Sequence, residues 1–197
     1  MSDPRPHEEG ASTSRRIEEA ALELFFERGY RTTTMRELAL ACGLTPGALY
    51  NHFASKDQIL YSILKDVHVQ LEAGLTEALR SAGPDPRERL RALVYAHAMF
   101  HTRLRKEANV ANEEVLSLED PGRSEIIAMR RRGRGLFEDA IRSGVASGDF
   151  EAVHVTVVAM AILNMGLRIA AWFRPDGPLS AEQVADVHAD LALRMVG

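Results

Sequence analysis

The amino-acid sequence predicts an all-α protein of about nine helices. Apolar residues recur at the three- and four-residue spacing of helices along most of the 197 residues. Three Ser/Thr-x-x-Glu/Gln capping boxes, at Thr34, Ser55 and Ser180, mark the starts of helices. No part of the chain has the two-residue alternation of a strand, so the helical pattern alone determines the expected fold class.

Composition and charge narrow the class of protein. Hydrophobic residues make up 46% and charged residues 26% of the chain, which is ordinary for a soluble globular protein. The single Cys42 excludes an internal disulfide and is typical of the reducing cytoplasm. Residues 1–11 are polar and are expected to form a flexible tail, not a signal peptide. A net charge of −4 disfavours a protein that coats nucleic acid nonspecifically, so any DNA contact is expected to be confined to one part of the surface.

The first helices form a compact N-terminal head. A one-faced amphipathic helix ends at Gly29. Its apolar positions are Ile17, Ala20, Ala21, Leu24 and Phe25. Thr34 opens a second helix, and a tight turn at residues 42–44 leads to a third. Thr45 caps that third helix and Pro46 occupies its first position, where the missing N–H costs nothing.

The second and third helices, with the Gly-containing turn between them, are typical of a helix-turn-helix, whose second helix enters the major groove of DNA. The third helix is too short to be stable by itself, and its outer face is polar. The residues expected to contact DNA are Thr33, Thr34, Arg36, Thr45, Pro46, Gly47, Ala48, Tyr50, Asn51, His52 and Lys56. Because the helix tip lacks Arg, Lys and Gln, specificity is expected to come from thymine methyls, from Arg36 or from DNA shape. The alternative is that these helices only resemble a helix-turn-helix and belong to an unrelated helical protein. Tyr50 would then be a half-buried aromatic residue of the core.

Residues 81–86 contain the clearest break in the chain and indicate a domain boundary. Asp85 then caps the next helix, with Pro86 in its first position. The helices expected beyond the break lie at about 85–106, 113–118, 120–147, 152–173 and 180–195.

Residues 152–173 are long and apolar enough to tempt a membrane assignment, but His154, Asn164 and Arg168 make a bilayer span costly. A helix that is apolar on nearly all sides is instead buried on both sides, here between a pocket and a partner subunit. With the last helix it is expected to form a four-helix dimer interface. The interface candidates are Ala159, Gly166, Ala170, Val184, Val187, Leu191 and Met195. The alternative is that both helices are core of a single chain.

Soft apolar residues and a basic run suit a ligand that has an apolar tail and an anionic head. Arg130 and Arg134 share one side of their helix because they are four residues apart. The ligand candidates are His97, Phe100, His101, Met129, Arg130, Arg134, Phe137, Met160, Asn164 and Arg168. The pair His97 and His101 could ligate a metal, but no Cys or carboxylate completes a known spacing. Pocket or core histidines are favoured, so neither a metal nor a cofactor is expected. No catalytic constellation is found, so an enzyme is not expected.

The run of residues 17–60 resembles the TetR family of transcriptional regulators. The matching stretches are residues 20–25, 29–30, 33–39, 43–44, 48–53 and 55–56. The resemblance implies a homodimer that binds a palindromic operator and releases it when a small molecule fills the C-terminal domain. By position it implies that the DNA contacts include Thr34, Thr45, Gly47, Tyr50, His52 and Lys56.

A second set of residues looks like a TetR subgroup that represses fatty-acid or steroid degradation genes and is induced by acyl-CoA thioesters. The set is Asn112-Glu113, the Arg130 region, and residues 148–150, 172–177 and 179–180. The expected protein is therefore a cytoplasmic repressor with its DNA-binding domain at 12–60 and its ligand and dimerisation domain at 61–197. Its expected inducer is a long-chain acyl-CoA or similar CoA thioester. A regulator of efflux genes induced by aromatic or cationic drugs is one alternative, and a helical adaptor or enzyme with a coincidental helix-turn-helix is another.

Overall fold

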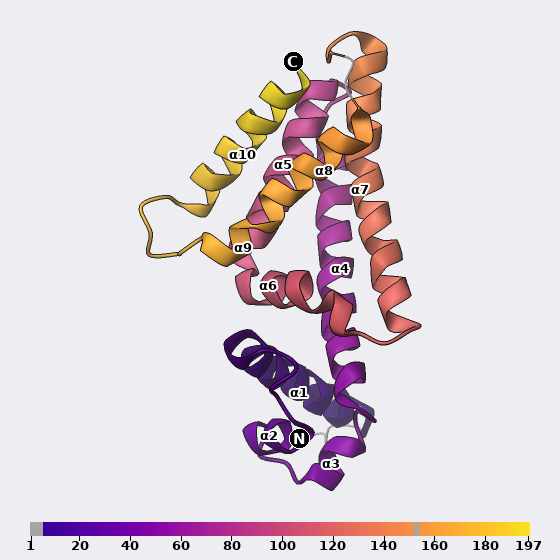
Figure 1. The fold of residues 1–197 in the computed structure, drawn as a ribbon, viewed down its shortest axis with the longest axis vertical. Helices are drawn as coiled ribbons and strands as arrows, with labels where there is room; N and C mark the ends of the chain where they lie inside the picture. Colours follow the sequence, from indigo (N-terminus) through magenta and orange to yellow (C-terminus); the bar gives the residue numbers. More distant parts are fainter. Residues whose placement is uncertain (1–5, 152–153) are drawn as a thin grey trace, which may run out of the picture.

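A computed structural model describes residues 6–151 and 154–197, with side chains from residue 12 on. In this part of the chain the structure contains α-helices, one 3-10 helix and no strand (Figure 1). The elements are α1 (Pro6–Arg28), α2 (Met35–Ala41), α3 (Pro46–Tyr50), α4 (Lys56–Ser81), α5 (Pro86–Arg103), α6 (Arg105–Glu114), η1 (Val115–Ser117), α7 (Gly122–Ser147), α8 (Val155–Leu167), α9 (Ile169–Trp172) and α10 (Ala181–Val196). The prediction of an all-α fold is confirmed for the described residues. The helix count also agrees with the expected nine when α8 and α9, which form one helical run with a break at Arg168, are counted together.

Two of the three predicted capping boxes, at Thr34 and Ser180, are complete, whereas at Ser55 the Gln58 side chain accepts from the Ala54 N–H instead of the Ser55 N–H. The Thr34 hydroxyl oxygen accepts from the Glu37 N–H at 3.3 Å, and the Glu37 carboxylate accepts from the Thr34 N–H at 2.8 Å. Ser180 forms the same reciprocal pair with Gln183 at the start of α10. These bonds satisfy backbone donors that a helix start leaves free, which is why short polar residues stand at these positions.

Three boundaries differ from the sequence prediction. Helix α1 begins at Pro6, so residues 6–11 of the expected tail are helical. The helix expected to continue to about residue 106 ends at Arg103, because Leu104 leaves the helical conformation. A separate helix, α6, follows at Arg105–Glu114, between the two helices that the sequence predicts there. The short helix expected at 113–118 is the end of α6 followed by η1. Of the expected run 152–173, residues 152 and 153 lie outside the described residues.

The head, α1 to α3, lies at one end of the molecule, and α4 runs from it into the larger domain (Figure 1). The boundary proposed at residue 60 therefore falls inside a continuous helix. The apolar core of the head is also continuous with α6 and α7 through residues such as Val110, Val115 and Met129. Helices α4 and α6 thus pack directly against the head.

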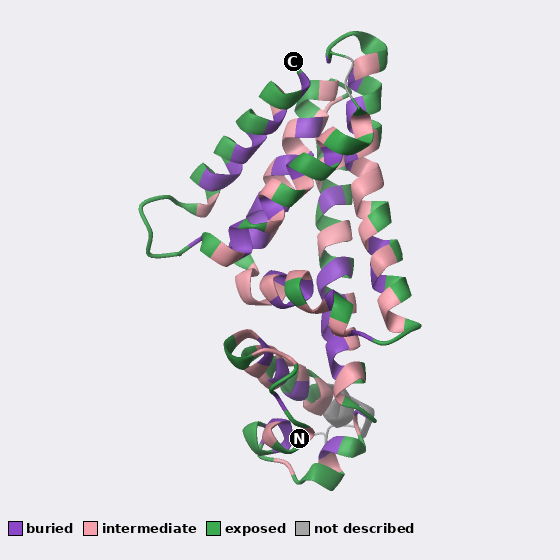
Figure 2. Cartoon of the chain, viewed as in Figure 1, coloured by how far each residue is buried: buried purple, intermediate pink, exposed green. Residues whose placement is uncertain are grey.

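The larger domain is built around α5, which packs against α4, α7, α8 and α10. Two glycines permit close approaches within it. A Cβ at Gly166 of α8 would overlap the His97 ring of α5, and one at Gly144 of α7 would overlap the Phe150 ring. The stretch Val155–Trp172 is long and apolar enough to cross a membrane by length and composition. Only 28% of it is buried, and the rest is intermediate or exposed in the single chain (Figure 2).

Candidate DNA-binding face and ligand cavity

The short helix α3 is held against the head by two apolar side chains. Leu49 is fully buried and Phe53 nearly so. Gly43 makes the preceding turn with a φ of +66°, a left-handed conformation that favours glycine. The Arg16 guanidinium donates to the Cys42 carbonyl at 3.1 Å and fixes the same turn. The position of α3 is therefore set by the core and the turn, which leaves its outer face available.

Seven of the eleven expected DNA contacts are exposed, five of them in or beside α3 and two at the start of α2. The exposed ones are Thr34, Arg36, Thr45, Pro46, Gly47, Tyr50 and Asn51. Tyr50 is 53% exposed, which excludes the alternative that it is a core aromatic residue. Ala48 and His52 are half-buried, and His52 Nδ1 lies 3.4 Å from the Ser14 hydroxyl of α1.

Thr33 is a correction to the expected set. Its side chain is only 2% exposed, and its hydroxyl donates to the Gly29 carbonyl at 3.0 Å. The Thr33 hydroxyl therefore stabilises the turn between α1 and α2, and its buried side chain is not available to a DNA phosphate.

Lys56 is a second correction, because its ammonium group points inward. Nζ donates to the carbonyls of Tyr30 at 2.6 Å and Thr33 at 2.7 Å, and it lies 4.1 Å from the centre of the Tyr30 ring. Burial lowers the pKa of this lysine. Lys56 thus ties the start of α4 to the α1–α2 turn, and the sequence carried no signal that distinguishes this role from a phosphate contact.

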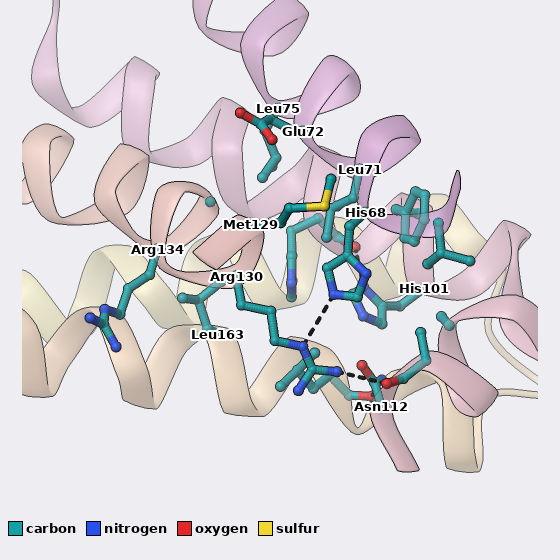
Figure 3. A pocket seen from close by; sticks show the side chains of 17 residues that line it. His68, Leu71, Glu72, Leu75, His101, Asn112, Met129, Arg130, Arg134 and Leu163 are labelled. Carbon is teal, nitrogen blue, oxygen red and sulfur yellow. Dashed lines mark hydrogen bonds between the residues drawn. The ribbon is translucent and has the colours of Figure 1, made fainter. Parts of the chain in front are cut away.

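The larger domain contains a cavity of about 120 Å³ that is lined by residues of α4, α5, α6, α7 and α8 (Figure 3). Six of the ten expected ligand residues line it: His97, Phe100, His101, Met129, Arg130 and Arg134. Sequence reasoning missed several others, among them His68, Leu71, Leu75, Asn112 and Leu163. The signal for the α4 residues was present, because they continue the apolar spacing of Leu64 and Val67 toward the C-terminus of the helix.

Arg130 is the most unusual residue of the cavity wall. Its Nε donates to His68 Nε2 at 3.1 Å and its Nη2 donates to the Ala111 carbonyl of α6 at 2.7 Å (Figure 3). Burial lowers its pKa. Among the described residues, no carboxylate lies within 4.0 Å of this guanidinium, whereas Arg134 Nε is 3.0 Å from Glu138 Oε1. Even a partly buried cation without a countercharge is costly unless another acceptor compensates it.

The cavity histidines are neutral. His68 Nδ1 lies 2.6 Å from the Leu64 carbonyl, and since a carbonyl only accepts, Nδ1 carries the hydrogen and Nε2 is free to accept from Arg130. Burial lowers the pKa of His68 and of His101 to about 4, and that of His97 well below its usual value. His101 Nδ1 is bound to the His97 carbonyl at 2.8 Å. In the described residues no group of three His, Cys, Asp or Glu side chains is placed to hold a metal ion.

Four expected ligand residues lie elsewhere. Phe137 is fully buried and contacts the His97 ring edge-on. Met160 is 45% exposed on the outer side of α8. Asn164 and Arg168 line a separate polar groove of about 280 Å³. This groove shares Asn112 and Leu167 with the cavity, so it lies directly beside it.

The expected dimer residues divide into two groups. Ala159, Gly166, Ala170 and Val184 are buried inside their own chain, which corrects their assignment to an interface between subunits. Val187, Leu191 and Met195 are 50%, 41% and 38% exposed and follow one another along α10. Three large apolar side chains of α8 and α9 are exposed as well: Val157, Met160 and Trp172. We call these six exposed residues the outer apolar face.

Comparisons with known proteins cover both parts of the chain. Residues 17–63 match the model of bacterial regulatory proteins of the tetR family, and residues 83–196 match the tetracyclin repressor-like C-terminal domain. The transcriptional repressor KstR2 of Mycobacterium tuberculosis (strain ATCC 25618 / H37Rv) is 31% identical over 188 residues, which cover 93% of this chain and 94% of that protein.

Solved structures agree over nearly the whole length. A tetR-family regulatory protein from Rhodococcus RHA1 has 33% identity and a TM-score of 0.88, covering 94% of this chain and 97% of that one. AibR in complex with isovaleryl coenzyme A and operator DNA has 33% identity and a TM-score of 0.83, with 91% and 97% of the two chains covered.

Proposed function

Since the chain belongs to the TetR family of bacterial transcriptional regulators, we propose that it is a homodimeric repressor that leaves its operator when a CoA thioester occupies the cavity. The exposed side chains of α2 and α3 contact DNA, and two heads read half-sites about 34–36 Å apart. The outer apolar face joins the two subunits, because an exposed apolar surface of this kind marks an interface. The protein acts in the cytoplasm, where the chromosome is.

The observation that carries the ligand assignment is the partly buried Arg130 guanidinium, which bonds only His68 and a backbone carbonyl, at a cavity whose wall is mostly apolar. An acyl group fits the apolar wall, and the carbonyl oxygen at its head accepts a hydrogen bond from Arg130. The polar groove beside the cavity, with Arg168 and Asn164, accommodates the phosphate-bearing part of the molecule. The complex of AibR with isovaleryl coenzyme A supports this class of ligand. A cationic drug, the ligand of the efflux alternative, is disfavoured by the charge of Arg130, because the carboxylate that lines the cavity, Glu72, is already bonded to Arg132.

Helix α6 offers a route from the cavity to the head. Its Ala111 carbonyl accepts from Arg130 on the cavity side. At its N-terminal end, Lys106 bonds both carboxylate oxygens of Glu23 in α1, at 2.6 and 2.7 Å. At its other end, the Glu114 carboxylate accepts from the Tyr30 N–H at 3.3 Å.

A ligand that engages the guanidinium competes with the Ala111 carbonyl. We infer that α6 then shifts and takes α1 with it, so that the two heads no longer match the half-site spacing. Thermodynamically, the ligand needs only to bind this second arrangement better than the DNA-bound one.

The test is fluorescence anisotropy with a labelled duplex from the region upstream of the protein's own gene. We expect saturable binding by a dimer, loss of binding in Tyr50→Ala, and release by short acyl-CoAs but not by free CoA. Binding that persists at saturating acyl-CoA concentrations would overturn the ligand part of the proposal. Equal binding by the Tyr50→Ala protein would overturn the DNA face.

A further inference from the structure

The cavity is small for the family of ligands it is proposed to hold. An apolar void of about 150 Å³ is known to take up benzene, so about 120 Å³ has room for roughly four to six carbon atoms. Pockets for larger ligands typically measure about 300–1,000 Å³. In this state the cavity accommodates a short acyl group and not the long chain expected from the sequence.

A second hollow lies against the same cavity. An apolar groove of about 460 Å³ runs between α4 and α5, and its walls include Gly74, Ala96 and Met99. Three side chains line both hollows: Leu71 and Leu75 of α4 and Phe100 of α5. They form the partition between cavity and groove.

Phe100 is the largest member of this partition. Its ring is half-buried and lies edge-on to the His101 ring, with the centroids 5.6 Å apart. The side of the cavity with Arg130 and Asn112 adjoins the polar groove, while the side with Phe100 adjoins the apolar one. An acyl chain whose carbonyl is bound to Arg130 therefore ends against the partition.

We propose that Phe100, together with Leu71 and Leu75, sets the maximum length of the acyl group, and that the ligand is a short-chain acyl-CoA. This inference rests on the proposed function, since it presumes that the cavity binds a thioester. Removal of the Phe100 ring joins the two hollows and creates an apolar channel that admits longer chains.

The experiment is calorimetric titration with butyryl-, hexanoyl-, octanoyl- and dodecanoyl-CoA, each below its micelle concentration, with free CoA as reference. The full-length dimer is used as wild type, Phe100→Ala, Phe100→Leu and Met99→Ala. Met99 is the matched control because it lines only the groove. Its truncation enlarges the groove without opening the partition.

We expect the wild-type protein and Met99→Ala to bind butyryl- or hexanoyl-CoA most tightly and dodecanoyl-CoA at least about tenfold more weakly. Phe100→Ala should reverse this order, with Phe100→Leu in between, and Phe100→Leu serves alone if the Ala variant does not fold. Wild-type binding that is indifferent to chain length, or a length preference unchanged by either Phe100 variant, would refute the partition while leaving the proposed function intact. No binding of any acyl-CoA by any variant would instead refute the proposed function.

Discussion

Arg130 of α7 donates a hydrogen bond to His68 of α4 across 3.1 Å, and this contact determines the chemistry of both side chains. Because the Leu64 carbonyl holds the Nδ1 hydrogen of His68, the ring can only accept at Nε2. A neutral acceptor does not cancel the charge of the guanidinium. The two bonds to His68 and to the Ala111 carbonyl use two of the five N–H donors of Arg130 and leave its charge without a carboxylate partner. Donors therefore remain for an electron-rich atom of a ligand.

The first prediction concerns Arg130 itself. Arg130→Met removes a charge-assisted hydrogen bond worth about 1.5–3 kcal/mol, so short acyl-CoAs should bind about tenfold or more weakly. Arg131→Met is the matched control, since Arg131 is the exposed neighbour on the same helix. Calorimetric titration measures both. Equal ligand affinity in the wild-type and Arg130→Met proteins would contradict the assignment.

A second prediction tests the packing of α8 on α5. In Gly166→Ala the new methyl overlaps the His97 ring, and such overpacking costs about 1–3 kcal/mol. In Gly135→Ala, by contrast, nothing lies within 4 Å of the added Cβ, and the change should stabilise α7 by up to about 1 kcal/mol. Urea unfolding of the two variants should give shifts of opposite sign. A harmless Gly166→Ala would show that the helices are not in close contact.

The third prediction separates an inward lysine from a phosphate contact. Lys56→Met should lower the melting temperature and weaken operator binding, but leave the salt dependence of binding unchanged. Arg36→Met, which removes an exposed cation, should instead reduce the slope of log K against log salt by about one. Operator titrations at several salt concentrations measure this slope. A reduced slope for Lys56→Met would restore its role as a phosphate contact.

The fourth prediction concerns pH. The pKa of His68 and of His101 is lowered to about 4 by burial, against about 6.5 in the unfolded chain. Between these values the unfolded chain binds more protons, so the free energy of unfolding falls as the pH is lowered below about 6.5. At pH 5.5 each histidine should cost about 1 kcal/mol relative to pH 7.

Denaturant unfolding at pH 7 and at pH 5.5 checks this expectation. The window lies above the range where the ion-paired carboxylates titrate, since pKa values such as that of Glu37 are lowered. His101→Asn retains a donor for the His97 carbonyl and should lose less stability on acidification than the wild-type protein. An identical loss in both proteins would argue against a neutral buried His101.

Local signals made the head and the helix starts predictable. Capping residues such as Thr34 and Ser180 accept hydrogen bonds from backbone N–H groups three residues further along the chain. A few consecutive residues are therefore enough to identify them. The orientation of α8 was not predictable. When a helix is apolar on all sides, its sequence does not indicate which side faces the core. Only the packing of α8 on α5 shows that Ala159 faces inward and Met160 outward. The prediction that Lys56 and Thr33 contact DNA is wrong because both side chains bond carbonyls of the α1–α2 turn. The sequence does not show that these carbonyls lie within reach.

If ligand and operator oppose each other through one molecule, each must weaken the binding of the other, and both effects can be measured on the same dimer. The affinity for isovaleryl-CoA is measured on the free dimer and on the dimer saturated with operator, and operator affinity is measured with and without the ligand. Linkage requires both ratios to be the same factor, and couplings of this kind amount to about 5–150-fold. We predict that the operator-bound dimer binds the ligand more weakly than the free dimer, by the same factor with which the ligand weakens operator binding. Ligand affinity that is unchanged by the operator would contradict it.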